Sequence, residues 1–118
     1  MIVKVYRIEP KATAAVKKIV EEPEAMKEVA PGKQEWFVNE WARNGYSLRD
    51  AGSMGLSEQC SYLYVKAETE DFFKKNEKAI MVEGVKELKG EELEKVRKKV
   101  EEEQESAAAG VGAIFGDL

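Results

Sequence analysis

The order of apolar and polar positions along the chain predicts alternating strands and helices. Residues 2–8 are rich in Val, Ile and Tyr and are followed by Pro10, which favours a β-strand that ends there. From Ala12 onward the apolar positions follow the 3.6-residue period of a helix, and Pro23 marks its far end. The apolar face of this helix consists of Ala12, Ala15, Val16, Ile19 and Val20.

The next segment is also predicted to be helical. Met26 and Val29 indicate a further turn of helix before a Pro-Gly turn signal. A second helix is predicted over residues 33–44, because its large apolar residues share one stripe. Gly45 follows at the position where a helix often ends in left-handed backbone. The stripe consists of Phe37, Val38, Trp41 and Ala42.

Two strands, a short helix and a last strand complete the predicted domain. Residues 46–51 and 59–67 predict a hairpin with a glycine-containing loop. Thr69 suits the N-cap of the following helix. The final strand is predicted over residues 80–88, with a bulge or bend at Gly84.

This order of elements predicts an α+β domain over residues 1–89. It matches the split βαβ, or ferredoxin-like, arrangement of an antiparallel sheet with helices on one face, and another two-layer α+β sandwich is the alternative. A charged helix is predicted over residues 90–105, lying across the domain at its start and projecting at its end. Residues 106–118 then predict an Ala/Gly hinge and an apolar tail. The helix's thin apolar stripe consists of Leu93, Val96 and Val100.

The amino-acid composition limits the classes of function that this chain could have. The 118 residues include 23 acidic and 19 basic ones, a net charge of −4, which argues against bulk electrostatic binding of nucleic acid. The abundance of Glu and Lys is typical of heat-adapted proteins. A single cysteine allows no intrachain disulfide, and neither a signal peptide nor a membrane-spanning run is evident. We therefore expect a cytoplasmic protein that does not associate with membranes.

The side chains that usually carry catalysis are scarce. The chain has no histidine, the residue most often used for proton transfer and metal binding. The sequence therefore predicts a non-enzymatic protein with no catalytic residues, cofactor or metal site. Cys60 is interpreted as a small, partly buried residue on the strand face of Tyr62 and Tyr64. The loop from Gly52 to Gly55 could approach a phosphate, but a simple turn is favoured.

Three tyrosines suggest a second function. In a ferredoxin-like sheet the first and third strands are central neighbours, so Tyr6, Tyr62 and Tyr64 are expected on one open face. RNA-recognition domains stack bases on aromatic rings placed in this way. RNA binding is therefore the alternative function.

The C-terminal tail carries the strongest indication of function. An acidic helix leads into an Ala- and Gly-rich segment and then into Val111, Ile114 and Phe115, whose spacing places them on one side of a helix. Residues 101–118 resemble the C-terminal tail of archaeal ribosomal stalk proteins, with Val111 and Ile114 where that family has leucines. The resemblance implies a translation- or ribosome-associated protein whose tail captures translational GTPases through these three residues.

Other interpretations of the chain remain open at this stage. The tail could fold back onto an apolar patch of its own domain, or it could be an unstructured end. A dimeric small-molecule or regulatory domain is a third functional hypothesis. A homodimer is compatible with each of them.

Overall fold

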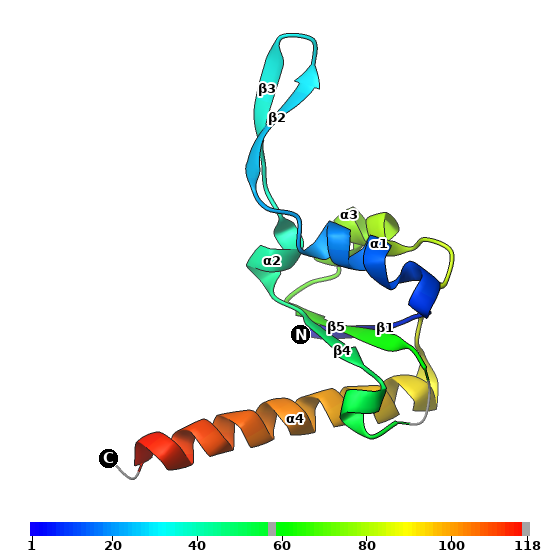
Figure 1. Ribbon diagram of the computed structural model, residues 1–118, viewed down its shortest axis with the longest axis vertical. Coiled ribbons are helices and arrows are strands. Elements are labelled where there is room, and N and C mark those ends of the chain that lie inside the picture. Colours follow the sequence, from blue (N-terminus) through cyan, green and yellow to red (C-terminus); the bar gives the residue numbers. More distant parts are fainter. Residues whose placement is uncertain (57–58, 117–118) are drawn as a thin grey trace.

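The computed structural model describes residues 1–56 and 59–116, and of their side chains all but those of Met54 and residues 104–116. Strands and helices are interspersed along the chain, and α4 is the last element (Figure 1). The elements are β1 (Ile2–Ile8), α1 (Pro10–Val20), β2 (Ala25–Ala30), β3 (Lys33–Phe37), α2 (Glu40–Asn44), β4 (Ser47–Asp50), the 3-10 helix η1 (Gly52–Met54), β5 (Ser61–Ala67), α3 (Asp71–Ile80), β6 (Val85–Glu87) and α4 (Gly90–Gly116).

A four-stranded sheet in the order β4-β5-β1-β6 organises the domain. All of its neighbouring strands are antiparallel. β1 pairs with β5 along its whole length, from Ile2 opposite Ala67 to Ile8 opposite Ser61. The predicted α+β class is confirmed, as is the predicted hairpin of β4 and β5.

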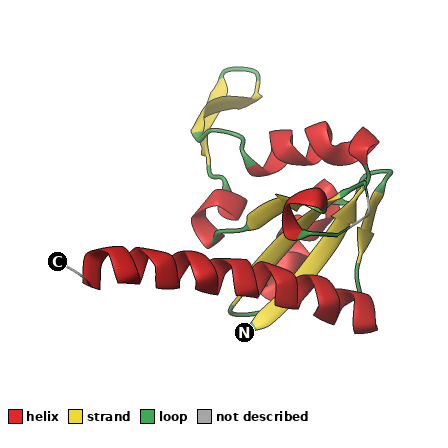
Figure 2. Cartoon of the chain, turned by 60° about the horizontal axis from the view of Figure 1, so that its bottom comes forward, coloured by secondary structure: helices red, strands yellow, loops and turns green. Residues whose placement is uncertain are grey.

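Helices cover both faces of this sheet. Figure 1 shows α1 and α3 on one side and α4 on the other, and the turned view in Figure 2 agrees. The hydrophobic core on the α1 and α3 side consists of Tyr6, Ile8, Ala12, Val16, Val20, Trp41, Leu63, Val65, Ala67, Phe73 and Ile80. A second hydrophobic core on the α4 side consists of Val5, Ala51, Cys60, Tyr62, Tyr64, Leu88, Val96 and Val100. Successive residues of β1 and β5 alternate between the two cores because strand side chains point to opposite faces in turn.

The helices predicted around residue 26 and over residues 33–44 are largely wrong. β2 and β3 form a separate two-stranded antiparallel sheet that stands away from the domain (Figure 1). The Pro-Gly pair turns the chain tightly, with Gly32 at φ 75°, so the flanking residues pair across the turn, as Met26 does with Trp36. Of the predicted second helix only α2 forms, and it ends at Asn44 as predicted, followed by Gly45 with φ 89°.

Two boundaries near the last strand also differ from the prediction. Ile80 ends α3 instead of beginning a strand, and β6 is confined to Val85–Glu87. Gly84 lies in the turn before β6 with φ 97°, and its carbonyl accepts a 2.9 Å hydrogen bond from the Glu9 amide. The N-cap of α3 is Glu70, without a side-chain capping bond, so the cap predicted at Thr69 is wrong.

The start of α4 lies across the sheet as predicted. Val96 and Val100 are buried there, 3% and 0% exposed. The helical backbone continues to Gly116, through the residues where a hinge was expected. Figures 1 and 2 show its C-terminal end reaching beyond the edge of the sheet. Within the described residues, no helix has the length and apolar character needed to cross a bilayer.

Candidate functional site

The three tyrosines of the RNA-binding hypothesis are not brought together. Tyr6 lies opposite Leu63 and Val5 lies opposite Tyr64, and opposite residues of an antiparallel pair project to the same face. Tyr6 therefore belongs to the α1 and α3 side, whereas Tyr62 and Tyr64 lie beneath α4. The prediction that they share one open face is wrong, because their positions on paired strands differ by one residue in register.

Burial also removes these rings from the surface. Tyr6 is fully buried, and its hydroxyl donates a 3.0 Å hydrogen bond to Oε1 of Glu77. Burial, reinforced by this carboxylate, raises the pKa of Tyr6 far above its usual range. Tyr62 and Tyr64 are 3% and 5% exposed. In this structure the sheet offers none of the three as a stacking platform for a base.

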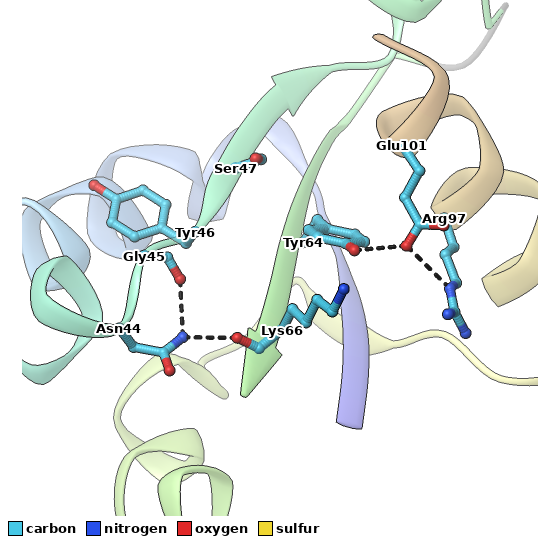
Figure 3. Close-up of a pocket in the computed structure, with 8 residues that line it drawn as sticks. All are labelled: Asn44, Gly45, Tyr46, Ser47, Tyr64, Lys66, Arg97 and Glu101. Atoms are coloured by element: carbon cyan, nitrogen blue, oxygen red, sulfur yellow. Dashed lines mark hydrogen bonds and ion pairs between the residues drawn. The ribbon is translucent and has the colours of Figure 1, made fainter. Parts of the chain in front are cut away.

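A hydrogen-bonded group that we call the α4 clamp fixes α4 to the sheet (Figure 3). The Tyr64 hydroxyl donates a 2.6 Å hydrogen bond to Oε2 of Glu101, and Nε of Arg97 donates to the same oxygen at 3.2 Å. Burial and then this hydrogen bond raise the pKa of Tyr64 to about 12. The Tyr64 hydrogen bond is the largest cause of a lowered pKa at Glu101. The clamp therefore holds a neutral phenol against a charged carboxylate.

A cleft of about 430 Å³ opens beside the clamp, between the start of β4 and α4. Asn44 closes one end, where its amide donates to the carbonyls of Gly45 and Lys66 at 2.9 and 3.1 Å. The ammonium of Lys66 adds to the lowering of the Glu101 pKa, so charges of both signs face each other across the cleft. The lining residues are Asn44, Gly45, Tyr46, Ser47, Tyr64, Lys66, Arg97 and Glu101 (Figure 3). We assign this cleft a structural role, because Glu101, the carboxylate of its lining, is already bound by Tyr64 and Arg97.

A cluster of carboxylates surrounds Lys4 on the other side of the sheet. The Lys4 ammonium lies 3.9, 3.6 and 3.9 Å from carboxylate oxygens of Glu70, Glu77 and Glu87. Burial raises the pKa of Glu87. Among the described residues, no group of three or more His, Cys, Asp or Glu side chains has an arrangement that could hold a metal ion.

The projecting hairpin is the feature that the sequence did not reveal. We call residues 25–38 the arm. Its side chains include Met26, Trp36 and Val38, which are 55%, 55% and 41% exposed. The available signal is the Pro-Gly pair with short mixed apolar and charged segments on both sides, and the apolar residues of these segments also fit a helical stripe.

The base of the arm is held by one buried amide. Asn39 is 2% exposed, and its Nδ2 donates to the carbonyls of Val20 and Glu22 at 2.9 and 2.8 Å. Its Oδ1 accepts from the Ala42 amide as the N-cap of α2. One side chain thus ties the end of α1, the entry to the arm and the start of α2.

A charged pair reinforces this junction. Nε and Nη2 of Arg43 donate to the two carboxylate oxygens of Glu24 at 2.7 and 2.9 Å. The backbone N–H of Asn39 donates to Oε2 of Glu24 as well, at 2.9 Å. The Arg43 hydrogen bonds, followed by that of Asn39, lower the pKa of Glu24 to about 2.

The other positions singled out in the sequence are the loop at residues 52–55, Cys60 and the C-terminal tail. Residues 52–55 form η1 and a turn in which the Gly55 amide donates to Gly52, so the simple-turn interpretation is confirmed. Cys60 is buried with Tyr62 and Tyr64, as interpreted. The three predicted partner-binding residues belong to the α4 backbone, and their side chains lie outside the described ones. These are Val111, Ile114 and Phe115.

Comparison with known proteins gives no family for this chain. It finds no match to a family model, a curated protein or a solved structure.

Proposed function

We propose that this chain is a non-enzymatic, translation-associated interaction protein whose C-terminal tail binds a translational GTPase. The observation that carries the proposal is the asymmetric anchoring of α4. The helix is fixed to the sheet at its start, and its far end reaches beyond the sheet (Figures 1 and 2).

Contacts near the middle of α4 make its first half a fixed stem. Val100 is fully buried, Glu101 accepts hydrogen bonds from Tyr64 and Arg97, and Glu103 lies 3.5 Å from Nε of Arg49. A helix rises 1.5 Å per residue. The positions of the stalk-like residues therefore follow the anchored part by about two to four turns, far enough for a partner to approach them.

The expected affinity follows from the three apolar side chains. Burying each of Val111, Ile114 and Phe115 contributes roughly 1.5 to 3 kcal/mol. Ordering the segment opposes this by about 2 to 5 kcal/mol. The balance leaves at most about 7 kcal/mol, a dissociation constant of roughly 10 micromolar or weaker, suitable for a factor that must exchange rapidly.

The same proposal includes a ferredoxin-like fold for the main domain. The order β4-β5-β1-β6, with α1 directly after β1 and α3 between β5 and β6, supports a ferredoxin-like domain. In that view the arm and α2 are an insertion between the first helix and the second strand of the sheet. α4 is an addition on the face that α1 and α3 leave open.

The test is a binding titration of the full chain with an archaeal elongation factor of the translational GTPase class. Phe115→Ala is expected to weaken binding at least tenfold, because it removes the largest apolar side chain. Ala113→Ser is the matched control, since position 113 falls on the opposite side of a helix from position 115 and binding should not change. Equal binding by Phe115→Ala and the unsubstituted chain would refute the proposal.

A further inference from the structure

We propose that the apolar face of the arm is a contact surface for a second copy of this chain, and that the protein forms a weak symmetric dimer through it. The inference depends on the arm alone and not on the C-terminal tail. It follows from the isolation of the arm, the arrangement of its apolar side chains and the pairing of its charges.

The arm is a two-stranded sheet with both outer edges unpaired. Figure 1 shows β2 and β3 extending away from α1 and α2 without another element beside them. A hairpin of this size is marginally stable in water unless its face packs against something. An additional contact at this place would therefore stabilise the arm.

Two of the exposed apolar side chains of the arm, those of Met26 and Trp36, share one face. Met26 and Trp36 are register partners, so they project to the same side. Val38, which is 41% exposed, comes directly after the end of β3 at Phe37.

The charged groups around this face already have partners within the chain. Lys27 is paired with Glu22, and Lys33 lies 3.6 Å from Glu35. Glu28 accepts a 3.2 Å hydrogen bond from the amide of Gly32 at the tip. With Glu24 bound by Arg43, the arm needs apolar surface from a partner rather than opposite charge. This argues against a nucleic acid as the occupant, because phosphates require unpaired cations.

A second copy of the chain offers exposed apolar surface mainly on its own arm. Large apolar side chains that are exposed within the described residues gather there more than anywhere else. They are Met1, Met26, Val29, Trp36, Val38, Met81 and Val82, of which Met26, Val29, Trp36 and Val38 belong to the arm. A two-fold contact uses one patch twice and so needs no other complementary surface. It would set Trp36 of each copy against Met26 of the other, a favourable pairing of sulfur with an aromatic ring.

The size of the arm sets the strength of the dimer. Its longer strand has 6 residues, which at about 3.3 Å per residue spans roughly 20 Å. A contact between two such ribbons is smaller than the roughly 1,200 Å² or more that stable complexes bury. We therefore expect a dimer whose population rises with protein concentration.

The experiment is sedimentation velocity of the full chain over a range from low to high micromolar concentration. The sedimentation coefficient of the unsubstituted chain should rise toward that of a dimer. Trp36→Lys and Met26→Lys should each keep the protein monomeric, because they place a charge in the contact. Both positions are more than half exposed in the single chain, so these variants are expected to fold, which circular dichroism checks.

Met81→Lys is the matched control, because it introduces the same charge at an exposed apolar residue outside the arm. This variant should dimerise like the unsubstituted chain. A monomer at every concentration, or dimers of unchanged strength in Trp36→Lys, would overturn the proposal. Loss of the dimer in Phe115→Ala would instead show that the tail of the other copy covers the arm, and would also overturn the contact between arms.

Discussion

Tyr64 of β5 and Glu101 of α4 are 37 positions apart in the chain and are joined by a hydrogen bond of 2.6 Å. The bond links an inner strand of the sheet to the helix that carries the C-terminal tail. It therefore connects the stability of the domain with the position of the segment proposed to bind a partner.

Removing the Tyr64 hydroxyl should loosen α4. Tyr64→Phe leaves Glu101 with Arg97 as its remaining hydrogen-bond partner and should lower the free energy of unfolding by about 1 to 2 kcal/mol. Urea denaturation measures this loss. Tyr46→Phe is the control, because the side chain of Tyr46 packs against the core on the α1 and α3 side and is not part of the clamp, so it should lose less. Equal losses in the two variants would contradict the assigned role of the clamp.

The clamp should also respond to alkaline pH. The pKa of Tyr64 is raised from 10.0 to about 12, so its stabilising effect is complete below pH 10 and is lost as the pH rises through 12. The NMR resonances of the Tyr64 ring should titrate with a midpoint near pH 12. Glu101→Gln should shift that midpoint toward 10, because the carboxylate no longer opposes ionisation. A midpoint that does not move would show that Glu101 has no part in the shift.

Acid should release the base of the arm. The pKa of Glu24 is lowered from 4.5 to about 2, so its link to Arg43 is fully present above pH 4.5 and is lost as the pH falls through 2. The carboxyl carbon shift of Glu24 should report a midpoint near pH 2. In Arg43→Gln the midpoint should return toward 4.5. A midpoint near 4.5 in the unsubstituted protein would mean that the pair does not form in solution.

The buried amide of Asn39 should be costly to remove. Asn39→Ala loses the N-cap of α2 and leaves the carbonyls of Val20 and Glu22 without their donor, so we expect a loss of about 2 to 4 kcal/mol. Thermal and urea denaturation both test this value. Asn44→Ala is the matched control, since that amide is exposed and should cost under about 1 kcal/mol. Losses of similar size would contradict the special position of Asn39.

Gly84 should tolerate no side chain. Gly84→Ala imposes φ 97° on an L-residue and brings the new Cβ to 3.1 Å from Cβ of Ala12, with an expected loss of about 1 to 3 kcal/mol. Gly52→Ala meets no atom within 4 Å and should change stability by less than about 0.5 kcal/mol. The difference in unfolding midpoint between the two variants is the measurement. Comparable midpoints would mean that the turn before β6 relaxes around a side chain.

Prediction from the sequence succeeded where the pattern of one segment was sufficient. The periodicity of residues 12–20 and the β-branched run of residues 2–8 each specify an element whose apolar face is buried in the structure. It failed over residues 25–37, because Phe37 and Trp36 fit a helical stripe as well as a strand. The choice between the two depends on cross-strand pairing with residues that precede the Pro-Gly turn.

The sequence by itself determined the α+β class, the strands of the main sheet, the helical start of α4 and the scarcity of catalytic side chains, because local periodicity and composition carry that information. Tertiary structure alone decided that Tyr6 and Tyr64 face opposite cores, that α4 packs on the face opposite α1 and α3, and that the arm stands clear of the domain. These outcomes depend on strand register and on packing between residues far apart in the chain. No local pattern contains that information.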